Sequence, residues 1–230
     1  MAGGGGFRWI DVSAQRFPGW IDSFAGRHGA DAATAQALTA VSAPGQVIFT
    51  APDGATAESH PPFGESFVPA PGETDPGALV RAISAHAVRP RVTGVLLVRL
   101  GGYAAGVFTG YPPKLADSKV GSRLVHGRSA AGGWSQHRFA RRREKQASEA
   151  LNAAADTAAL VFGRGPQLDT VVLGGDKRSM AELREDPRLA RYLALATERF
   201  LTVSDPKRAI LEATPAQFTA VKIKLTEPAG

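Results

Sequence analysis

The chain has 230 residues, of which 43% are hydrophobic, and it carries a net charge of +6 at pH 7 with no cysteine. These values are ordinary for a globular protein of one large domain or two small ones, and they exclude disulfides and thiolate metal sites. No run of 18 apolar residues is present, so a membrane-spanning helix is not expected. Since the N-terminus also lacks the features of a signal peptide, we expect a protein of the reducing cytoplasm.

Residues 1–60 are predicted to form a small α+β unit. Residues 17–27 have the pattern of an amphipathic helix, because apolar residues from Phe17 onward share one face, and Pro18 is acceptable in the first turn. Turns rich in Pro and Gly separate the remaining apolar segments. The expected strands are 8–12, 36–41, 46–50 and 55–59.

Residues 61–76 contain five prolines, and we interpret them as a linker or a long surface loop. Asp75 at the end of this segment is expected to cap a helix at 77–88. The sequence therefore predicts a small N-terminal unit at 1–60, a linker, and a second domain at 77–230.

The second domain begins with a segment at 92–100 that is almost continuously apolar, as expected of a buried central strand. Gly101 and Gly102 then predict a tight turn into another strand, so that the two form a hairpin. The strands expected after that turn are 103–109, 118–126, 170–173, 200–203 and 220–225, and the helices are 135–161, 177–184, 187–196 and 206–213. A strand meander followed by alternating helices and strands indicates a mixed sheet with helices packed on it.

The positive charge is concentrated in one segment of this domain. Residues 119–145 contain eight basic residues and one acidic residue, so the rest of the chain is close to neutral. A local basic patch is typical of proteins that bind nucleic acid or another acidic surface.

The same segment joins a glycine-containing loop at 127–136 to a long helix, for which Ser135 is the expected N-cap. The free N–H groups at the start of a helix favour acidic residues, whereas this helix begins with four arginines. We interpret the loop and the arginines as a site for phosphate. The alternative is a solvated basic face on an amphipathic helix.

Gln136 is the candidate for chemistry in this segment. Glutamine cannot act as a general base at neutral pH, but it can position a water by accepting one hydrogen bond and donating another. The alternative is an ordinary glutamine at a helix start. Trp134 can stack on a base or fold back to anchor the loop, and we favour the anchor. His126 and His137 have no suitably spaced partners for a metal site.

The residues from Gly132 onward resemble the signature of the Vms-like release factors, in their actinobacterial branch. These proteins are peptidyl-tRNA hydrolases related to the catalytic domain of eukaryotic and archaeal class I release factors. The matching residues are Gly132, Gly133, Trp134, Ser135, Gln136, Arg138–Arg143 and Gln146. The resemblance covers residues 91–227 and, more weakly, the first sixty. It implies an α+β protein whose second domain has an RNase H-like mixed sheet.

The resemblance also implies that the protein releases nascent chains from peptidyl-tRNA on stalled large ribosomal subunits, without a stop codon because no stop-codon-reading domain is recognised. The loop would enter the peptidyl transferase centre, with Gln136 as the catalytic residue on a catalytic loop formed by Gly132, Gly133, Trp134 and Ser135. Classical release factors have glutamine directly after two glycines, whereas two residues intervene here. The residues expected to contact rRNA or tRNA are Arg128, Arg138, Arg141, Arg142 and Lys145.

The implied partners are the ribosome, peptidyl-tRNA and rRNA. No cofactor, metal or membrane is implied, and the protein is expected to be a monomer. Two alternatives remain. An endonuclease would cleave near the 3′ CCA end of the tRNA and leave a truncated RNA, whereas ester hydrolysis leaves that end intact. A non-catalytic RNA-binding module would keep its binding after Gln136→Ala and would have no turnover to lose.

Overall fold

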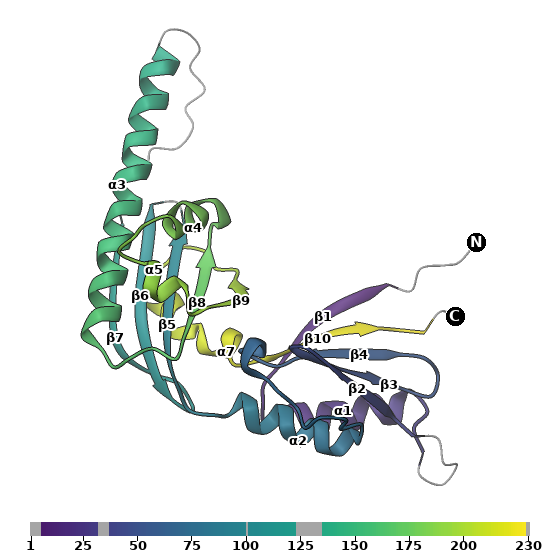
Figure 1. Ribbon diagram of the computed structural model, residues 1–230. Coiled ribbons are helices and arrows are strands. Elements are labelled where there is room, and N and C mark those ends of the chain that lie inside the picture. Colours follow the sequence, from purple (N-terminus) through teal and green to yellow (C-terminus); the bar gives the residue numbers. More distant parts are fainter. Residues whose placement is uncertain (1–5, 32–36, 100, 123–134, 229–230) are drawn as a thin grey trace. The chain divides into compact units, whose positions relative to one another are not determined.

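A computed structural model describes residues 6–31, 37–99, 101–122 and 135–228, with side chains in the last range described from Lys145 onward. The chain forms two compact units (Figure 1). Unit 1 comprises Met1–Arg89 and Ala216–Gly230, and unit 2 comprises Pro90–Pro215. In the described part of the chain, no helix is long and apolar enough to cross a membrane.

This division corrects the predicted boundaries at 1–60, 61–76 and 77–230. The helix after the proline-rich segment, α2 (Pro76–Ala87), buries its apolar face in the core of unit 1, so 61–76 does not join the two units. The last strand, β10 (Val221–Thr226), also lies in unit 1. Sequence reasoning missed this arrangement because β10 pairs with strands more than 150 residues away, and local periodicity carries no information about such a partner.

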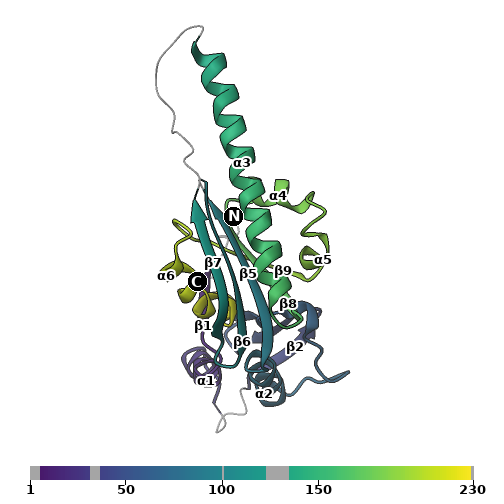
Figure 2. The same cartoon turned by 90° about the vertical axis from the view of Figure 1, so that its left-hand side faces the viewer.

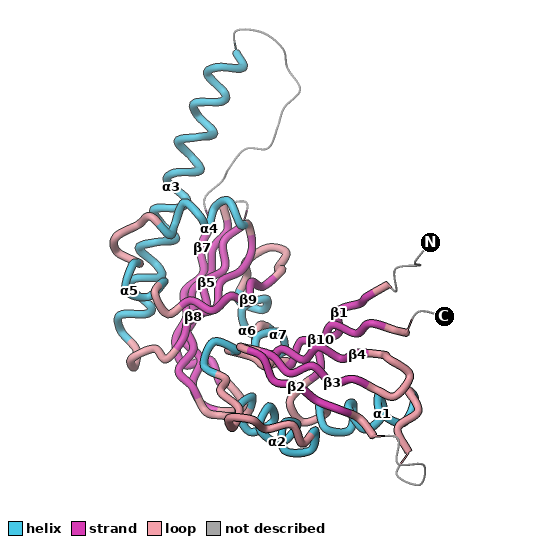
Figure 3. The backbone as a smooth tube through the Cα atoms, turned by 45° about the vertical axis from the view of Figure 1, so that its right-hand side comes forward, coloured by secondary structure: helices cyan, strands magenta, loops and turns pink. Residues whose placement is uncertain are grey.

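Unit 1 contains a five-stranded sheet in the order β1-β10-β4-β3-β2, with every neighbouring pair antiparallel. Its other strands are β1 (Phe7–Val12), β2 (Thr39–Ala43), β3 (Gln46–Thr50) and β4 (Thr56–His60). The helices α1 (Phe17–Arg27) and α2 both lie along one face of this sheet (Figure 3), and a short 3-10 helix, η1, covers Gly64–Ser66.

The two faces of the unit 1 sheet differ because side chains alternate along each strand. On the face under α1 and α2, Phe49 and Ile223 are fully buried. On the opposite face Trp9 is 47% exposed, Phe7 is 60% exposed, and Lys222 lies 4.7 Å from the centre of the Trp9 ring. One covered and one open face are common in antiparallel sheets.

Several local predictions in unit 1 are confirmed. Helix α1 has the predicted bounds, and its Phe17 and Phe24 are buried in the core. Asp75 caps α2 by accepting a hydrogen bond at 2.7 Å from the backbone N–H of Ala78, which satisfies one of the free donors at the helix start.

Unit 2 contains the predicted mixed sheet, in the order β7-β6-β5-β8-β9. The first three strands form an antiparallel meander, and β8 and β9 add to it in parallel, which is the RNase H-like arrangement. The strands are β5 (Arg91–Arg99), β6 (Gly102–Gly110), β7 (Lys114–Ser122), β8 (Thr170–Gly175) and β9 (Ala196–Leu201). The helices are α3 (Ser135–Arg164), α4 (Lys177–Arg184), α5 (Ala190–Leu193) and α6 (Arg208–Ala213). The short helix α7 (Pro215–Phe218) follows where the chain passes back into unit 1.

Helices cover both faces of the unit 2 sheet. On one face, α3, α4 and α5 share a core with Leu96, Tyr103 and Val107 of the central strands. On the other face, α6 places Leu211 against Gly106, where a Cβ atom would lie 2.9 Å from the leucine side chain. The glycine therefore allows α6 to lie close to β6.

Strand β7 begins four residues earlier than predicted, at Lys114 rather than at 118. It is an edge strand with weak apolar alternation, so its register is decided by pairing with β6, from Thr109 opposite Lys114 to Gly102 opposite Ser122. The helix expected at 187–196 is shortened to α5, because β9 already starts at Ala196.

Candidate functional site

The residues predicted to form the site lie at the junction of a loop and α3. Gly132, Gly133, Trp134 and Arg128 fall outside the described residues. Ser135 and Gln136 are the first two residues of α3. The structure therefore places the predicted catalytic glutamine in the first turn of a 30-residue helix.

The basic residues predicted to contact RNA occupy the N-terminal part of the same helix. Arg138, Arg141 and Arg142 lie on the helical backbone, but their side chains are outside the described part, whereas Lys145 is described and exposed. At about 100° per residue, these four positions fall within one arc of roughly 100° on the helix surface.

Among the described side chains of α3, those that pack on the sheet lie in its C-terminal half. Ala154 and Ala158 are fully buried, and with Val161 they lie in the core against β5 and β6. Among the described side chains before Ala150, only Gln146 is partly covered and the others are exposed. Figure 2 shows the helix running along the sheet and continuing past its end.

The apolar positions along α3 are buried only in part. Ala154 and Ala158 are buried and Leu151 is partly buried, whereas Ala147 is exposed. The helix continues past the end of the sheet, and helical periodicity alone could not reveal where its packing on the sheet stops. The segment Ser135–Glu149, about 22 Å long at 1.5 Å per residue, projects from the sheet. We call it the projecting half of α3.

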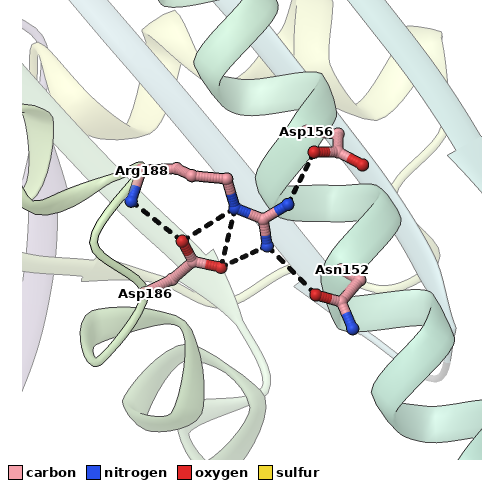
Figure 4. A network of polar contacts seen from close by, with 4 residues as sticks. All are labelled: Asn152, Asp156, Asp186 and Arg188. Carbon is pink, nitrogen blue, oxygen red and sulfur yellow. Dashed lines mark hydrogen bonds and ion pairs between the residues drawn. The ribbon is translucent and has the colours of Figure 1, made fainter.

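Two polar contacts hold the packed half of α3. At its C-terminal end, Arg164 donates Nη2 to both carboxylate oxygens of Asp117 on β7, at 3.1 and 2.9 Å. Nearer the projecting half, Arg188 from the turn between α4 and α5 binds Asn152 and Asp156 of α3 (Figure 4). Sequence reasoning missed both contacts, because no local pattern relates residues more than 30 positions apart.

Strand β7 ends at the same end of the sheet as β5, β8 and β9. Ser122, the last residue of β7, is opposite Gly102. A Cβ atom on Gly102 would lie 3.1 Å from Oδ1 of Asp205, and Nη1 of Arg99 donates to the carbonyl oxygen of Val203 at 2.5 Å. The segment around Val203 and Asp205 therefore packs against this end of the sheet.

The Gly174–Lys177 turn at the same end of the sheet has a structural role. Asp176 caps α4 by accepting hydrogen bonds from the backbone N–H and the hydroxyl of Ser179, at 3.2 and 2.7 Å. The hydroxyl bond is the main reason why the pKa of Asp176 lies below its ordinary value. Gly175 has φ +102°, and a Cβ atom there would lie 2.1 Å from the carbonyl oxygen of Val98. These contacts explain both residues without a bound ligand.

The basic residues of the protein are concentrated in unit 2, and many of them lie in the projecting half of α3 or in the residues before it. Unit 2 contains 20 basic and 12 acidic residues, whereas unit 1 contains seven basic and nine acidic residues. Eight of the basic residues of unit 2 lie in 119–145. In the described residues no group of three His, Asp or Glu side chains lies close enough to hold a metal ion. The arrangement is therefore suited to binding a polyanion at the end of a helix.

Comparisons with known proteins agree with this description. A family model described as "Actinobacteria/chloroflexi VLRF1 release factor" matches residues 91–224, more than half of the chain. The matched segment includes all of unit 2 except Pro90 and reaches into β10. No curated protein matches the chain in sequence.

Several solved structures resemble the chain distantly. An archaeal translation termination factor, aRF1, is 12% identical over 95% of this chain and 68% of its own, with a TM-score of 0.41. The Vms1 mitochondrial localization core is 8% identical over 77% of this chain and 75% of its own, with a TM-score of 0.36. Pelota of Archaeoglobus fulgidus is 12% identical over 95% of this chain and 65% of its own, with a TM-score of 0.33.

Proposed function

The chain belongs to the Actinobacteria/chloroflexi VLRF1 release factors, and on that premise we propose that it is a peptidyl-tRNA hydrolase. It frees nascent chains from tRNA on stalled large ribosomal subunits. The observation that supports this proposal is the position of Gln136, in the first turn of a helix whose N-terminal half projects from its sheet. A single helix, about 10 to 12 Å wide with its side chains, can enter a site from which a whole domain is excluded.

The reaction is the hydrolysis of the ester between the peptide and the 3′-terminal ribose of the tRNA. The oxygen of a water attacks the ester carbonyl carbon, the bond from that carbon to the ribose oxygen breaks, and a proton passes to the ribose oxygen. The amide of Gln136 does not titrate at neutral pH, so it does not take the proton. It positions the water by accepting one hydrogen bond from it and donating another within the site.

The basic positions on the projecting half bind the RNA that surrounds this ester. Arg138, Arg141, Arg142 and Lys145 share one arc of the helix, and that arc is opposite the buried stripe around Ala154 and Ala158 when the helix is continued at about 100° per residue. Phosphate contacts from this arc, and from Arg128 on the loop, orient the helix while its tip stays free for the ester.

The decisive experiment measures free peptide. Purified protein is mixed with isolated large ribosomal subunits that carry peptidyl-tRNA with a labelled peptide, which present no stop codon. We expect release of the peptide and a tRNA with an intact CCA end. A truncated 3′ end on the released RNA would indicate endonucleolytic cleavage instead of ester hydrolysis. Binding to the subunits without release of peptide would contradict an enzymatic function.

A further inference from the structure

One polar network fixes α3 close to the point where the helix leaves the sheet (Figure 4). Arg188 donates Nη1 to Oδ1 of Asp156 at 2.6 Å and Nη2 to Oδ1 of Asn152 at 3.0 Å. Asp186 holds the same guanidinium from the other side, accepting from Nε at 2.9 and 3.1 Å and also from Nη2. Every nitrogen of the guanidinium is therefore engaged, and a planar group with three fixed partners has one orientation.

The electrostatics of the network agree with its geometry. The hydrogen bonds from Arg188 hold the pKa of Asp186 below its ordinary value, and the pKa of Arg188 is raised, mainly by the hydrogen bond to Asp186. Both groups are thus charged over the whole neutral range. The network does not switch near neutral pH, and it acts as a constant constraint on α3.

Arg188 is presented by a rigid part of the fold. Its neighbour Leu189 is fully buried, and the ring of Tyr192 lies 5.3 Å from the ring of Phe162 on α3. The hydroxyl of Tyr192 also lies where a Cβ atom on Gly163 would be 3.2 Å away. The α4–α5 segment therefore contacts α3 at two levels, one near Phe162 and one near Asn152 and Asp156.

The contact of Arg188 with Asn152 and Asp156 lies on the side of α3 opposite the side that packs on the sheet. At about 100° per residue, Asn152 and Asp156 fall on the side of α3 away from Ala154 and Ala158, and both are exposed apart from the network. Apolar packing presses one side of the helix onto the sheet, and Arg188 restrains the opposite side. Two opposed contacts near the start of the projecting half define the direction in which it points.

Because the projecting half is long, a small change in its direction displaces the tip of the helix by several Å. Gln136 lies sixteen residues before Asn152, which is about 24 Å along a helix. A tilt of about 10° at Asn152 moves the helix tip by about 4 Å over that length. A catalytic group must be held within about 0.5 Å of its productive position, and an error of about 1 Å can cost about a hundredfold in rate.

We propose that Arg188 is a positioning residue for Gln136: through Asn152 and Asp156 it sets the direction of the projecting half and so the place of the glutamine. The catalytic consequence rests on the function proposed for Gln136. The constraint on the helix does not, so the two can be tested separately.

The first test measures the direction of the helix in the free protein. The chain has no cysteine, so cysteines introduced at Ala140 and Lys114 can carry spin labels on the projecting half and on β7. Double electron–electron resonance spectroscopy then gives the distribution of distances between the two spin labels. We expect Arg188→Met to broaden or shift this distribution relative to the labelled parent. An unchanged distribution would mean that the sheet alone directs α3, and it would overturn the proposal.

The matched control is Arg178→Met. Arg178 lies on α4, pairs with Glu182 four residues later at 3.4 Å, and has a side chain that is 90% exposed. The same substitution there removes an arginine and an ion pair from a neighbouring helix without touching α3, so the distance distribution should not change. Asn152→Ala and Asp156→Ala each remove one contact of Arg188 and should broaden the distribution, which covers the case in which Arg188→Met fails to fold.

The second test separates binding from chemistry. In single-turnover release at saturating ribosomal subunits, Arg188→Met should release peptide about tenfold more slowly or worse, while its dissociation constant for the subunits stays within about twofold of that of Arg178→Met. Arg188→Lys keeps the charge but loses the planar guanidinium that donates to several partners at once, and it should recover only part of the rate. Parental release rates from Arg188→Met would overturn the positioning role. An inactive parental protein would overturn the proposed function, and the distance measurement would still decide the constraint on α3.

Discussion

In the described part of the chain each unit has one five-stranded sheet, but the two units differ in how their strands are connected, in their net charge and in how their helices pack on the sheet. Unit 1 is fully antiparallel and is completed by β1 and β10 from opposite ends of the chain, so unit 2 is inserted within it. In unit 1 both long helices lie along the sheet. In unit 2 the longest helix lies on the sheet with one half and projects with the other.

The two units also differ in the kind of surface that they present. Unit 1 has a slight excess of acidic residues and an open face with Phe7 and Trp9, whereas unit 2 carries the positive charge of the protein in and around its projecting helix. The family match covers unit 2 and only a small part of unit 1. What the release-factor family shares is therefore mainly the unit with the basic helix.

The largest expected effect concerns the independence of the two cores. Phe49→Ala in unit 1 should lower the free energy of unfolding of that unit by about 3 to 5 kcal/mol, because the side chain is fully buried. Leu97→Ala should lower that of unit 2 by about 2 to 5 kcal/mol for the same reason.

Urea denaturation can assign these losses to a unit. Of the three tryptophans, Trp9 and Trp20 belong to unit 1 and Trp134 to unit 2, so in a Trp134→Phe background tryptophan fluorescence follows unit 1, while circular dichroism follows both units. We expect Phe49→Ala to shift the fluorescence transition more than Leu97→Ala does. Equal shifts in both signals for both variants would mean that the two units unfold as one.

The next prediction concerns chemistry, which we assign to unit 2. Gln136→Ala should leave the fold intact and slow peptide release by about 10²-fold or more, the scale expected when one positioned transition-state group is lost. Gln167→Ala, at an exposed position of the same unit, is the control and should release peptide normally. A folded Gln136→Ala protein with the parental release rate would remove the catalytic role of this residue.

The charge difference between the two units predicts which substitutions change the salt dependence of ribosome binding. Each phosphate contact removed by Arg138→Ala, Arg141→Ala or Arg142→Ala should reduce the slope of log K against log salt by roughly 0.7 to 0.9 in ribosome binding. Arg81→Ala removes an arginine of unit 1 whose side chain is 75% exposed, and the slope should stay unchanged. Equal effects at all four positions would indicate a diffuse charge effect in place of a defined RNA contact.

The smallest expected effect concerns a helix cap in unit 2. Asp176→Ala should cost about 1 kcal/mol of stability at neutral pH. The pKa of Asp176 in the folded protein lies below the ordinary value of 3.8, so its contribution is present above that value and is lost as the pH falls through the folded pKa. Thermal unfolding of both proteins from pH 7 downward should therefore give a difference that shrinks only under strongly acidic conditions. A constant difference would show that the charge of Asp176 does not contribute.

Features encoded by neighbouring residues were predictable from the sequence. Helices α1 and α4 have the predicted bounds, because Pro18 and Asp176 mark their starts and apolar periodicity marks their length. The hairpin of β5 and β6 follows from Gly101 and Gly102. The short signature around Gly132 and Gln136 pointed to the release factors, and the family match confirms that relationship. The catalytic role of Gln136 stays a prediction.

Only the tertiary structure decided which distant segments belong together. β10 lies between β1 and β4, and α2 packs in unit 1, so the chain does not divide at its proline-rich segment. The length of α3 follows from helix propensity, but the point where it leaves the sheet depends on where β6 and β7 end. The contacts of Arg188 with Asn152 and Asp156 join residues 36 and 32 positions apart. Strand partners and long polar contacts depend on how complete elements pack, and a local sequence pattern carries no record of that packing.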